Sequence, residues 1–173
     1  MSGVLVSKDV CPEEKCIRCV YHPLMIKTNG RLKREALLPP HNRKDVSLLR
    51  LKYTDENFCI NHGKKTTLNN QIFYGLASFF VESVIDCNQW ANATNNMIKA
   101  EVKYSPISNG VYISKKDDVY TEDDSIDLPM HADLFYNIEN NNEEGEPRTQ
   151  LRAYATELVK KVNFKHIDDF LDH

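Results

Sequence analysis

The sequence predicts an α+β fold in which a single mixed or antiparallel sheet of about five to six strands carries a C-terminal amphipathic helix. Two observations support this fold class. Apolar segments with the alternation or length of strands recur along the chain, but they do not alternate regularly with helical segments. Near the C-terminus, apolar side chains repeat at helical spacing over residues 151–162.

The length and composition of the chain fit one domain. It has 173 residues, of which 41% are hydrophobic and 27% are charged, as in an ordinary globular domain. Residues 1–15 are polar and contain Pro12. We therefore expect a flexible N-terminal lead-in over residues 1–15 and a single α+β domain over residues 16–173.

The first part of the chain predicts two strands and a short element between them. Residues 20–26 favour a strand, which ends at the turn signal Thr28-Asn29-Gly30. Residues 32–38 fit a strand or a short helix, which Pro39-Pro40 ends. Residues 46–53 are typical of a strand.

A helix is expected to follow. Thr54 can cap its N-terminus with a side-chain oxygen, and the acidic Asp55 and Glu56 suit the positive end of the helix dipole. Gly63 is expected to end this helix. Residues 73–85 are nearly continuously apolar, which predicts the central buried strand running into a second helix.

The second part of the chain predicts two half-buried strands. Apolar and charged residues alternate over residues 98–104, and residues 111–113 are expected to pair with that strand as a hairpin. An acidic loop is expected at residues 117–127. Residues 131–138 alternate again. The side chains expected on the buried face of this last strand are Ala132, Leu134, Tyr136 and Ile138.

The last helix is the most clearly marked element. Pro147 suits its first turn, and its apolar stripe should pack on the sheet. Residues 163–173 form a tail with apolar residues that can dock. The stripe consists of Leu151, Tyr154, Ala155, Leu158, Val159 and Val162.

Cysteine and histidine residues are spaced as in a zinc site. Cys16 and Cys19 have the C-x2-C spacing of a zinc half-site, and Cys59 and His62 are three residues apart on one face of the predicted helix. Three thiolates and one imidazole from two elements would close a tetrahedral site. This set therefore predicts a structural zinc ion.

Two alternatives to this zinc set remain open. Cys11, Cys16, Cys19 and His22 form a local set with the same ligand chemistry. The cysteines can instead be free thiols, because free cysteine behaves as a small buried hydrophobe. An offset of three residues would place Cys16 and Cys19 on opposite faces of an extended strand, which favours free thiols.

A second group of residues would suit an enzyme that acts on a phosphorylated substrate. Histidine can transfer protons, and arginine can stabilise developing negative charge. These residues lie on different segments, so such an enzyme requires them to meet in one cleft. The candidates are His22, His41, Arg43, Arg50 and His131.

Two of these candidates have predicted partners. His131 and Asp133 would face the same side of a strand, where Asp133 can orient the imidazole. Arg50 lies in an apolar run and would need a carboxylate partner when buried, for which Asp133 and Glu101 are the candidates.

Charge is distributed unevenly along the chain. Residues 1–70 hold 13 Lys and Arg against 7 Asp and Glu, whereas residues 71–173 hold 9 against 18. The basic residues of segment 27–65 are candidates for contact with nucleic acid, and either half can attract an oppositely charged protein. Alternatively, the two halves pack against each other or form a solvated surface.

Several functional classes find no support in the sequence. Phosphate-binding glycine motifs, the zinc-protease motif and the serine-hydrolase motif are absent. No stretch approaches the roughly 20 apolar residues of a membrane span, and the N-terminus lacks the apolar segment of a signal peptide. With five cysteines and no such signal, we expect a cytoplasmic protein with reduced thiols and no membrane partner.

Three short motifs stand out along the chain: Tyr21-His22-Pro23, Asp45-Val46-Ser47 and the run from Pro129 to Asp133. Together they resemble a diffuse group of uncharacterised small bacterial proteins with the pattern HP … DVS … P-x-HA. The resemblance spans about residues 20 to 135 and brings no activity with it. It implies a bacterial accessory protein of a defence or conflict gene cluster, and it does not require the Cys16/Cys19 pair.

Three functional hypotheses follow from these patterns. The first is a non-enzymatic accessory or adaptor domain that binds a protein partner. The second is a small enzyme that acts on RNA or a nucleotide through its histidines and arginines. The third is a zinc-stabilised module that binds nucleic acid, for which binding should weaken steeply with salt.

Overall fold

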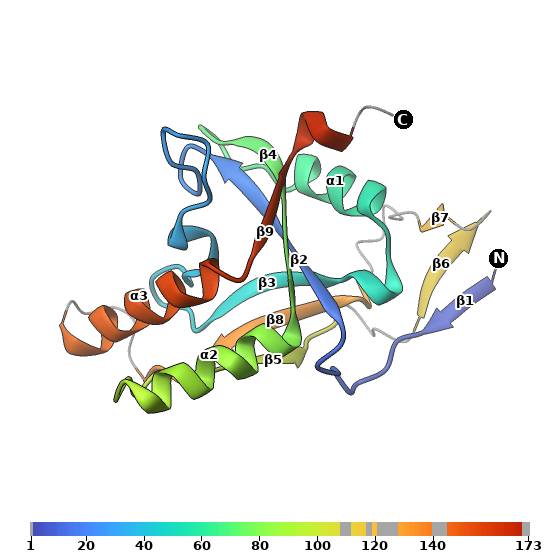
Figure 1. The fold of residues 1–173 in the computed structure, drawn as a ribbon. Helices are drawn as coiled ribbons and strands as arrows, with labels where there is room; N and C mark the ends of the chain where they lie inside the picture. The colour runs from blue at the N-terminus through green and yellow to red at the C-terminus, as the bar shows by residue number, and fades with distance from the viewer. Residues whose placement is uncertain (1, 108–111, 117–118, 121–127, 140–144, 171–173) are drawn as a thin grey trace.

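The computed structural model of the chain describes residues 2–107, 112–116, 119–120, 128–139 and 145–170 (Figure 1). The strands are β1 (Ser2–Leu5), β2 (Lys15–His22), β3 (Asp45–Arg50), β4 (Ile72–Phe80), β5 (Ala100–Tyr104), β6 (Tyr112–Lys116), β7 (Val119–Tyr120), β8 (His131–Tyr136) and β9 (Asn163–His166). The α-helices are α1 (Glu56–Lys65), α2 (Val81–Ala93) and α3 (Glu146–Val159). The short 3-10 helices are η1 (Arg34–Leu37), η2 (Leu51–Tyr53) and η3 (Ile167–Phe170).

The main sheet is antiparallel and has the strand order β5-β8-β3-β2-β4-β9. The strands β1, β6 and β7 form a smaller sheet beside it. Figure 1 shows β2, β4 and β9 crossing steeply over β3 and β8, so the main sheet is strongly twisted. One antiparallel sheet with a helix near the C-terminus confirms the predicted α+β class.

Helices pack on both faces of the main sheet and define the two larger of three apolar cores among the described residues. On one face α2 and α3 lie together, and on the other α1 covers β2 and β4. The α2–α3 core includes Cys16, Phe79, Leu134, Tyr136, Leu151 and Leu158. The α1 core includes Ile17, Cys19, Leu49, Phe58, Cys59 and Leu76.

Several predicted elements are confirmed. The apolar run at 73–85 is a strand that passes directly into a helix, β4 into α2. The four alternating side chains from Ala132 to Ile138 are each at most 2% exposed. The α3 stripe is equally buried at Leu151, Tyr154, Ala155 and Leu158.

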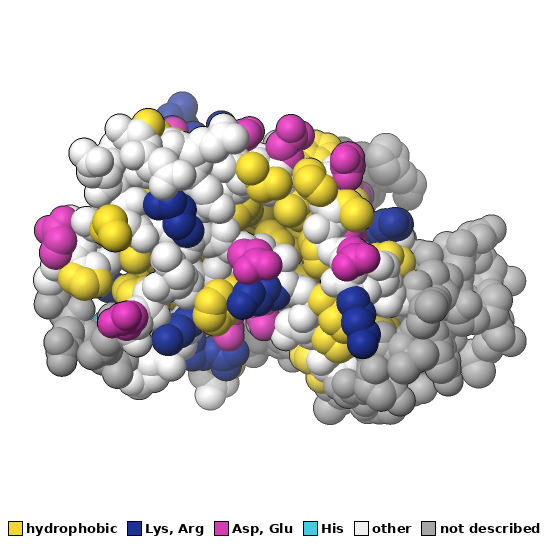
Figure 2. All heavy atoms as spheres, turned by 90° about the horizontal axis from the view of Figure 1, so that it is seen from below, with side chains coloured by type: hydrophobic (Ala, Val, Ile, Leu, Met, Phe, Trp, Pro, Cys, Tyr) yellow, Lys and Arg dark blue, Asp and Glu magenta, His cyan; other side chains and the backbone are white. Residues whose placement is uncertain are grey.

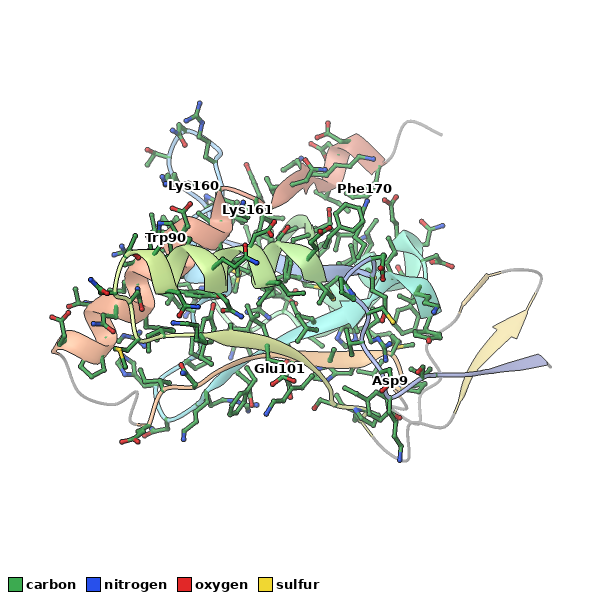
Figure 3. All side chains as sticks on the ribbon, turned by 60° about the horizontal axis from the view of Figure 1, so that its bottom comes forward. Asp9, Trp90, Glu101, Lys160, Lys161 and Phe170 are labelled. Carbon is green, nitrogen blue, oxygen red and sulfur yellow. The ribbon has the colours of Figure 1, made fainter. Side chains whose placement is uncertain are left out.

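The end of α2 lies near the start of α3, because Asn96 Nδ2 donates to the Gln150 carbonyl at 2.9 Å and the Met97 N–H donates to Gln150 Oε1 at 2.9 Å. Trp90 packs against the α2–α3 core. Figure 3 shows Trp90 on α2, which lies beside α3. The two helices therefore cover the sheet as one layer, and Trp90 is a natural reporter of that layer.

The predicted ends of α1 were wrong. Asp55, not Thr54, caps the N-terminus, because its Oδ1 accepts a hydrogen bond from the Phe58 N–H at 2.8 Å. The helix continues through Gly63 to Lys65. A Cβ at position 63 would overlap the ring of Phe73, so Gly63 permits close packing of α1 on β4 and does not end the helix.

The predicted hairpin between residues 98–104 and 111–113 was also wrong. The strand β5 pairs with β8, whereas β6 pairs with β1 and β7 in the smaller sheet. Residues 121–127 of the predicted acidic loop, with 117 and 118, lie outside the described residues. The tail forms an unexpected edge strand, since β9 pairs with β4 from Gly75 to Ser78.

The lead-in makes defined contacts after β1. Val6 and Glu14 are buried, and Ser7 donates its N–H to the Tyr53 hydroxyl at 3.2 Å. Among the described residues, no helix is long and apolar enough to cross a membrane.

Candidate functional site

The strands β2 and β3 diverge like the prongs of a fork. In the described part of the chain they pair at two positions, Cys16 with Arg50 and Ile17 with Leu49. Beyond this vertex β2 continues along β4, while β3 continues along β8. The separation leaves a cavity of about 590 Å³, which we call the fork cleft. Its size lies in the range of small-ligand pockets, roughly 300–1,000 Å³.

The walls of the fork cleft are mainly apolar. Ile17, Leu49 and Leu128 contribute buried side chains to it. Three further lining residues are unusually exposed for their type: Leu24 at 53%, Leu68 at 76% and Ile107 at 38%. They give the cleft an apolar rim that solvent reaches, and exposed apolar surface around a cavity is typical of a binding site.

Arg18 is the permanently charged side chain of this lining. Its Nε donates to the Ala36 carbonyl at 3.0 Å, and its Nη1 donates to the Ser47 carbonyl on β3 at 3.3 Å. Among the described residues, Nη2 has no hydrogen-bond partner and no carboxylate lies within ion-pair distance. Burial lowers the pKa of Arg18, but a guanidinium stays protonated in proteins.

His131 lines the cleft from the start of β8. Its Nδ1 lies 2.6 Å from the Ser105 carbonyl, which can only accept, so Nδ1 carries a proton. The neutral ring then has its lone pair on Nε2. Asp133 Oδ1 is 4.0 Å from Nδ1, so the predicted His–Asp pair is present as a long contact.

Gln71 also lines the cleft, just before β4. Its Oε1 is buried without a hydrogen-bond partner among the described residues, so this oxygen does not face the open space of the cleft. A buried acceptor left unpaired costs about 1–3 kcal/mol. His62 also lines the cleft, and its ring stacks on that of Phe58.

The predicted catalytic residues are not gathered in this cleft. Of the five, His131 lines it. His22 packs against Tyr74 with ring centroids 5.2 Å apart, and His41 is exposed in the loop before β3. Arg43 is paired with Asp45 at 2.7 Å.

Arg50 is buried, as predicted, but its predicted partners were wrong. Its guanidinium pairs with Glu14 at 2.9 Å and also donates to the carbonyls of Ser7 and Asp9. Figure 3 shows Glu101 on β5, which is the far edge of the sheet from β2. Arg50 therefore fastens the lead-in to the sheet.

The predicted zinc ligands are divided between the two cores. Cys16 belongs to the α2–α3 core, whereas Cys19 and Cys59 belong to the α1 core, where Cys19 Sγ is 3.6 Å from the Cys59 carbonyl. Burial raises the pKa of Cys16 and of Cys19 to about 12 and raises that of Cys59. Cys11, of the alternative local set, is exposed.

A zinc ion held by all four ligands would require Cys16 and Cys19 to face one side of β2. Among the described residues, no group of three or more His, Cys, Asp or Glu is arranged to hold a metal ion. The zinc site stays a prediction, and elemental analysis of protein purified without chelator tests it, with one zinc per chain supporting it.

Arg18 was missed by sequence reasoning, although a signal exists. It stands in the run KCIRCVYH, whose other members are largely buried on β2. A charged residue within such a strand marks a position that needs a partner. Several basic residues of segment 27–65 already have carboxylate partners, including Arg34, Arg43 and Arg50.

Comparisons of the chain with protein-family models, curated proteins and solved structures find no match. The function proposed for the protein therefore rests on the geometry of the fork cleft and on the residues that line it.

Proposed function

We propose that this protein is a non-enzymatic accessory or adaptor domain that binds a protein partner through the fork cleft. One observation carries the proposal: an apolar cavity inside the sheet has a rim of exposed Leu24, Leu68 and Ile107. Burying a leucine or isoleucine side chain is worth about 1.5–3 kcal/mol, so covering this rim would supply much of a moderate affinity.

The composition of the cleft supports a protein ligand. The centres of protein interfaces are rich in apolar side chains and arginine and poor in other charged residues. The cleft has this character, since Arg18 is the permanently charged member of its described lining. Partner contact at the cleft would also cover Arg18 and strengthen its electrostatic interactions by excluding water.

Site-specific photo-crosslinking tests this proposal. Leu68 is replaced by benzoylphenylalanine in the full chain, expressed in cells of its own source. Met97 serves as the matched control, because it is 74% exposed and does not line the cleft. The same replacement at Leu68, and not at Met97, should produce a discrete cross-linked protein.

The cross-linked protein is then purified and its affinity measured. Leu68→Asp should weaken binding by about 2 kcal/mol, the level of an interface hot spot, whereas Met97→Asp should have little effect. Equal cross-linking at both positions, or none at Leu68, would contradict the proposal.

The control is needed because exposed apolar atoms occur elsewhere. Figure 2 shows hydrophobic atoms at the surface on the face seen from below Figure 1, scattered among charged side chains. Large exposed apolar residues outside the cleft lining include Ile72, Phe80, Ile85 and Met97.

The enzyme hypothesis has one observation in its favour: Arg18 and His131 share the cleft. Proton transfer at Nε2 of His131 beside a guanidinium would suit a phosphate-containing substrate such as RNA or a nucleotide. To test this hypothesis, the purified protein and its His131→Ala variant are each incubated with RNA and with a nucleotide. Turnover lost in the variant would favour the enzyme over the adaptor.

The sequence also supports the cellular role and location that we propose for this protein. The resemblance described above supports an accessory role in a bacterial defence or conflict system, and the cysteine content supports a cytoplasmic location. Both belong to the proposal, as does contact of segment 27–65 with nucleic acid.

A further inference from the structure

The position of Arg18 singles out one kind of ligand. Arg18 is half-buried, and a guanidinium that is partly removed from water ordinarily has a carboxylate partner, because an unpaired charge is costly to desolvate. Arg18 has two carbonyl acceptors instead, and its Nη2 has no partner in the described part of the chain. A ligand carboxylate would supply the missing charge and accept from the terminal nitrogens, the arrangement that arginine favours.

The fork closes next to Arg18. The last paired residues of β2 and β3 are Ile17 and Leu49, and Arg18 follows directly on β2. A peptide that enters the opening between the strands therefore meets the vertex close to the guanidinium. A peptide whose C-terminus lies at the vertex fits this geometry better than a peptide that must continue past the vertex.

Other polar side chains line the cleft beside Arg18, among them Ser47, Asn69 and His131. Their hydroxyl, amide and imidazole groups can exchange hydrogen bonds with peptide amides, whereas a simple fatty acid has no N–H group to offer. At a peptide terminus the carboxylate, an amide N–H and an apolar side chain all lie around one Cα.

We propose that the fork cleft captures the C-terminal carboxylate of an apolar peptide segment, with Arg18 as the carboxylate receptor. This proposal rests on the adaptor function and names the part of the partner that enters the cleft. Capture of a terminal carboxylate is a recurring mode of peptide recognition. Here the last side chains of the peptide pack on the apolar walls and on the rim formed by Leu24, Leu68 and Ile107.

Peptide pools with two different ends test the proposal on the full-length protein. The probes are dye-labelled hexapeptides, N-acetylated and randomised over the last four residues, made once with a free carboxylate and once as the carboxamide. The free-acid pool should bind and be enriched for apolar last residues. Amidation should weaken binding by about tenfold or more, the loss of one charge-assisted contact.

Two variants and two controls assign the preference to the cleft. Arg18→Gln should bind both pools equally, whereas Arg43→Gln, outside the cleft, should keep the preference. Because Arg18 also bonds to Ala36 and Ser47, a second variant avoids the fold: Leu68→Asp places a negative charge on the exposed rim. This variant should weaken binding of the free-acid pool more than Leu68→Asn does.

Several results would overturn the proposal. One such result is that the wild type binds the free-acid and amidated pools equally, or binds neither. Another is that Arg43→Gln loses the free-acid preference as Arg18→Gln does. A third is that an amidated pool with a fixed internal aspartate binds as tightly as the free-acid pool. The adaptor function is judged separately. If benzoylphenylalanine at position 68 cross-links a protein partner but the free-acid preference is absent, capture of a terminal carboxylate is contradicted and the adaptor function stands.

Discussion

At the scale of single residues, the Arg50–Glu14 pair holds the N-terminal lead-in on the sheet. Arg50 is completely buried, Glu14 is 6% exposed, and the guanidinium also lies over the ring of Tyr53 at 4.8 Å. Burial alone would raise the pKa of Glu14, but hydrogen bonds from Arg50 and the Cys11 N–H, with the charge of Arg50, lower it overall.

Because of this pair, the stability of the fold depends on pH. The pKa of Glu14 in the folded protein lies below its ordinary value of 4.5. Its contribution to the free energy of unfolding is therefore fully present above pH 4.5 and is lost as the pH falls through the lower, folded pKa. Glu14→Gln should cost about 3–5 kcal/mol at neutral pH, because it leaves the Arg50 charge buried and unpaired.

Urea unfolding of the wild type and Glu14→Gln from neutral pH to below pH 4.5 checks this expectation. The difference between the two proteins should shrink as the pH falls. Glu13→Gln is the matched control, since Glu13 is the exposed neighbour, and its unfolding curve should follow the wild type. A pH-independent difference would show that Glu14 acts without its charge.

At the scale of elements, β9 depends on a close approach between two backbones. A Cβ added to Gly75 of β4 would overlap the Lys165 carbonyl and crowd the Cα of His166. The absence of a side chain at position 75 therefore lets β9 pair with β4. The strand lies at the edge of the sheet and is followed by η3, so the whole C-terminal segment depends on this pairing.

We expect Gly75→Ala to detach β9 while the other strands stay paired. Overpacking of this kind costs about 1–3 kcal/mol. Hydrogen exchange of the amides in residues 163–170 should speed up strongly, because exchange follows local opening. Ser78→Ala is the control, since Ser78 also faces β9 but already has a Cβ. Unchanged exchange in Gly75→Ala would mean that β9 tolerates the added methyl group.

The elements with the strongest patterns were predicted best. The alternation of β8 and the stripe of α3 depend on local period, which a single sequence displays directly. Pairings between distant segments were not predictable in this way. The hairpin expected for β5 failed because β8 and β1, far away in the chain, offered the actual partners.

The candidate site was less predictable than the fold. The histidines and arginines were chosen by chemistry, but a cleft exists where β2 and β3 separate, and no local pattern encodes where two strands part. Arg18 stands out in the sequence only once its neighbours are known to be buried. Arg50 was recognised as needing a carboxylate, yet Glu14 lies in a segment without periodicity.

At the scale of the whole molecule, β2 joins the two cores. Cys16 packs into the α2–α3 core, while Ile17 and Cys19 pack into the α1 core. Losing β2 from the sheet would open both cores together. We therefore infer that the six-stranded sheet and its helices unfold as one cooperative unit.

Coincident unfolding curves check this inference. Trp90 is the single tryptophan and packs on the α2–α3 core, so its fluorescence follows that side, whereas far-ultraviolet circular dichroism follows all helices and strands. The two signals should give one urea midpoint and one slope. Separate midpoints would show that the α1 core melts independently.

The separation of β2 from β3 also gives the sheet an inner border. Besides its outer strands β5 and β9, the sheet has a stretch of β3, residues 45–48, that β2 leaves uncovered. Unpaired strand borders invite a foreign strand to add on and aggregate, and proteins commonly protect them with a positive charge. Arg18 donates to the Ser47 carbonyl on this border, so its guanidinium already occupies an acceptor that an added strand would need for pairing.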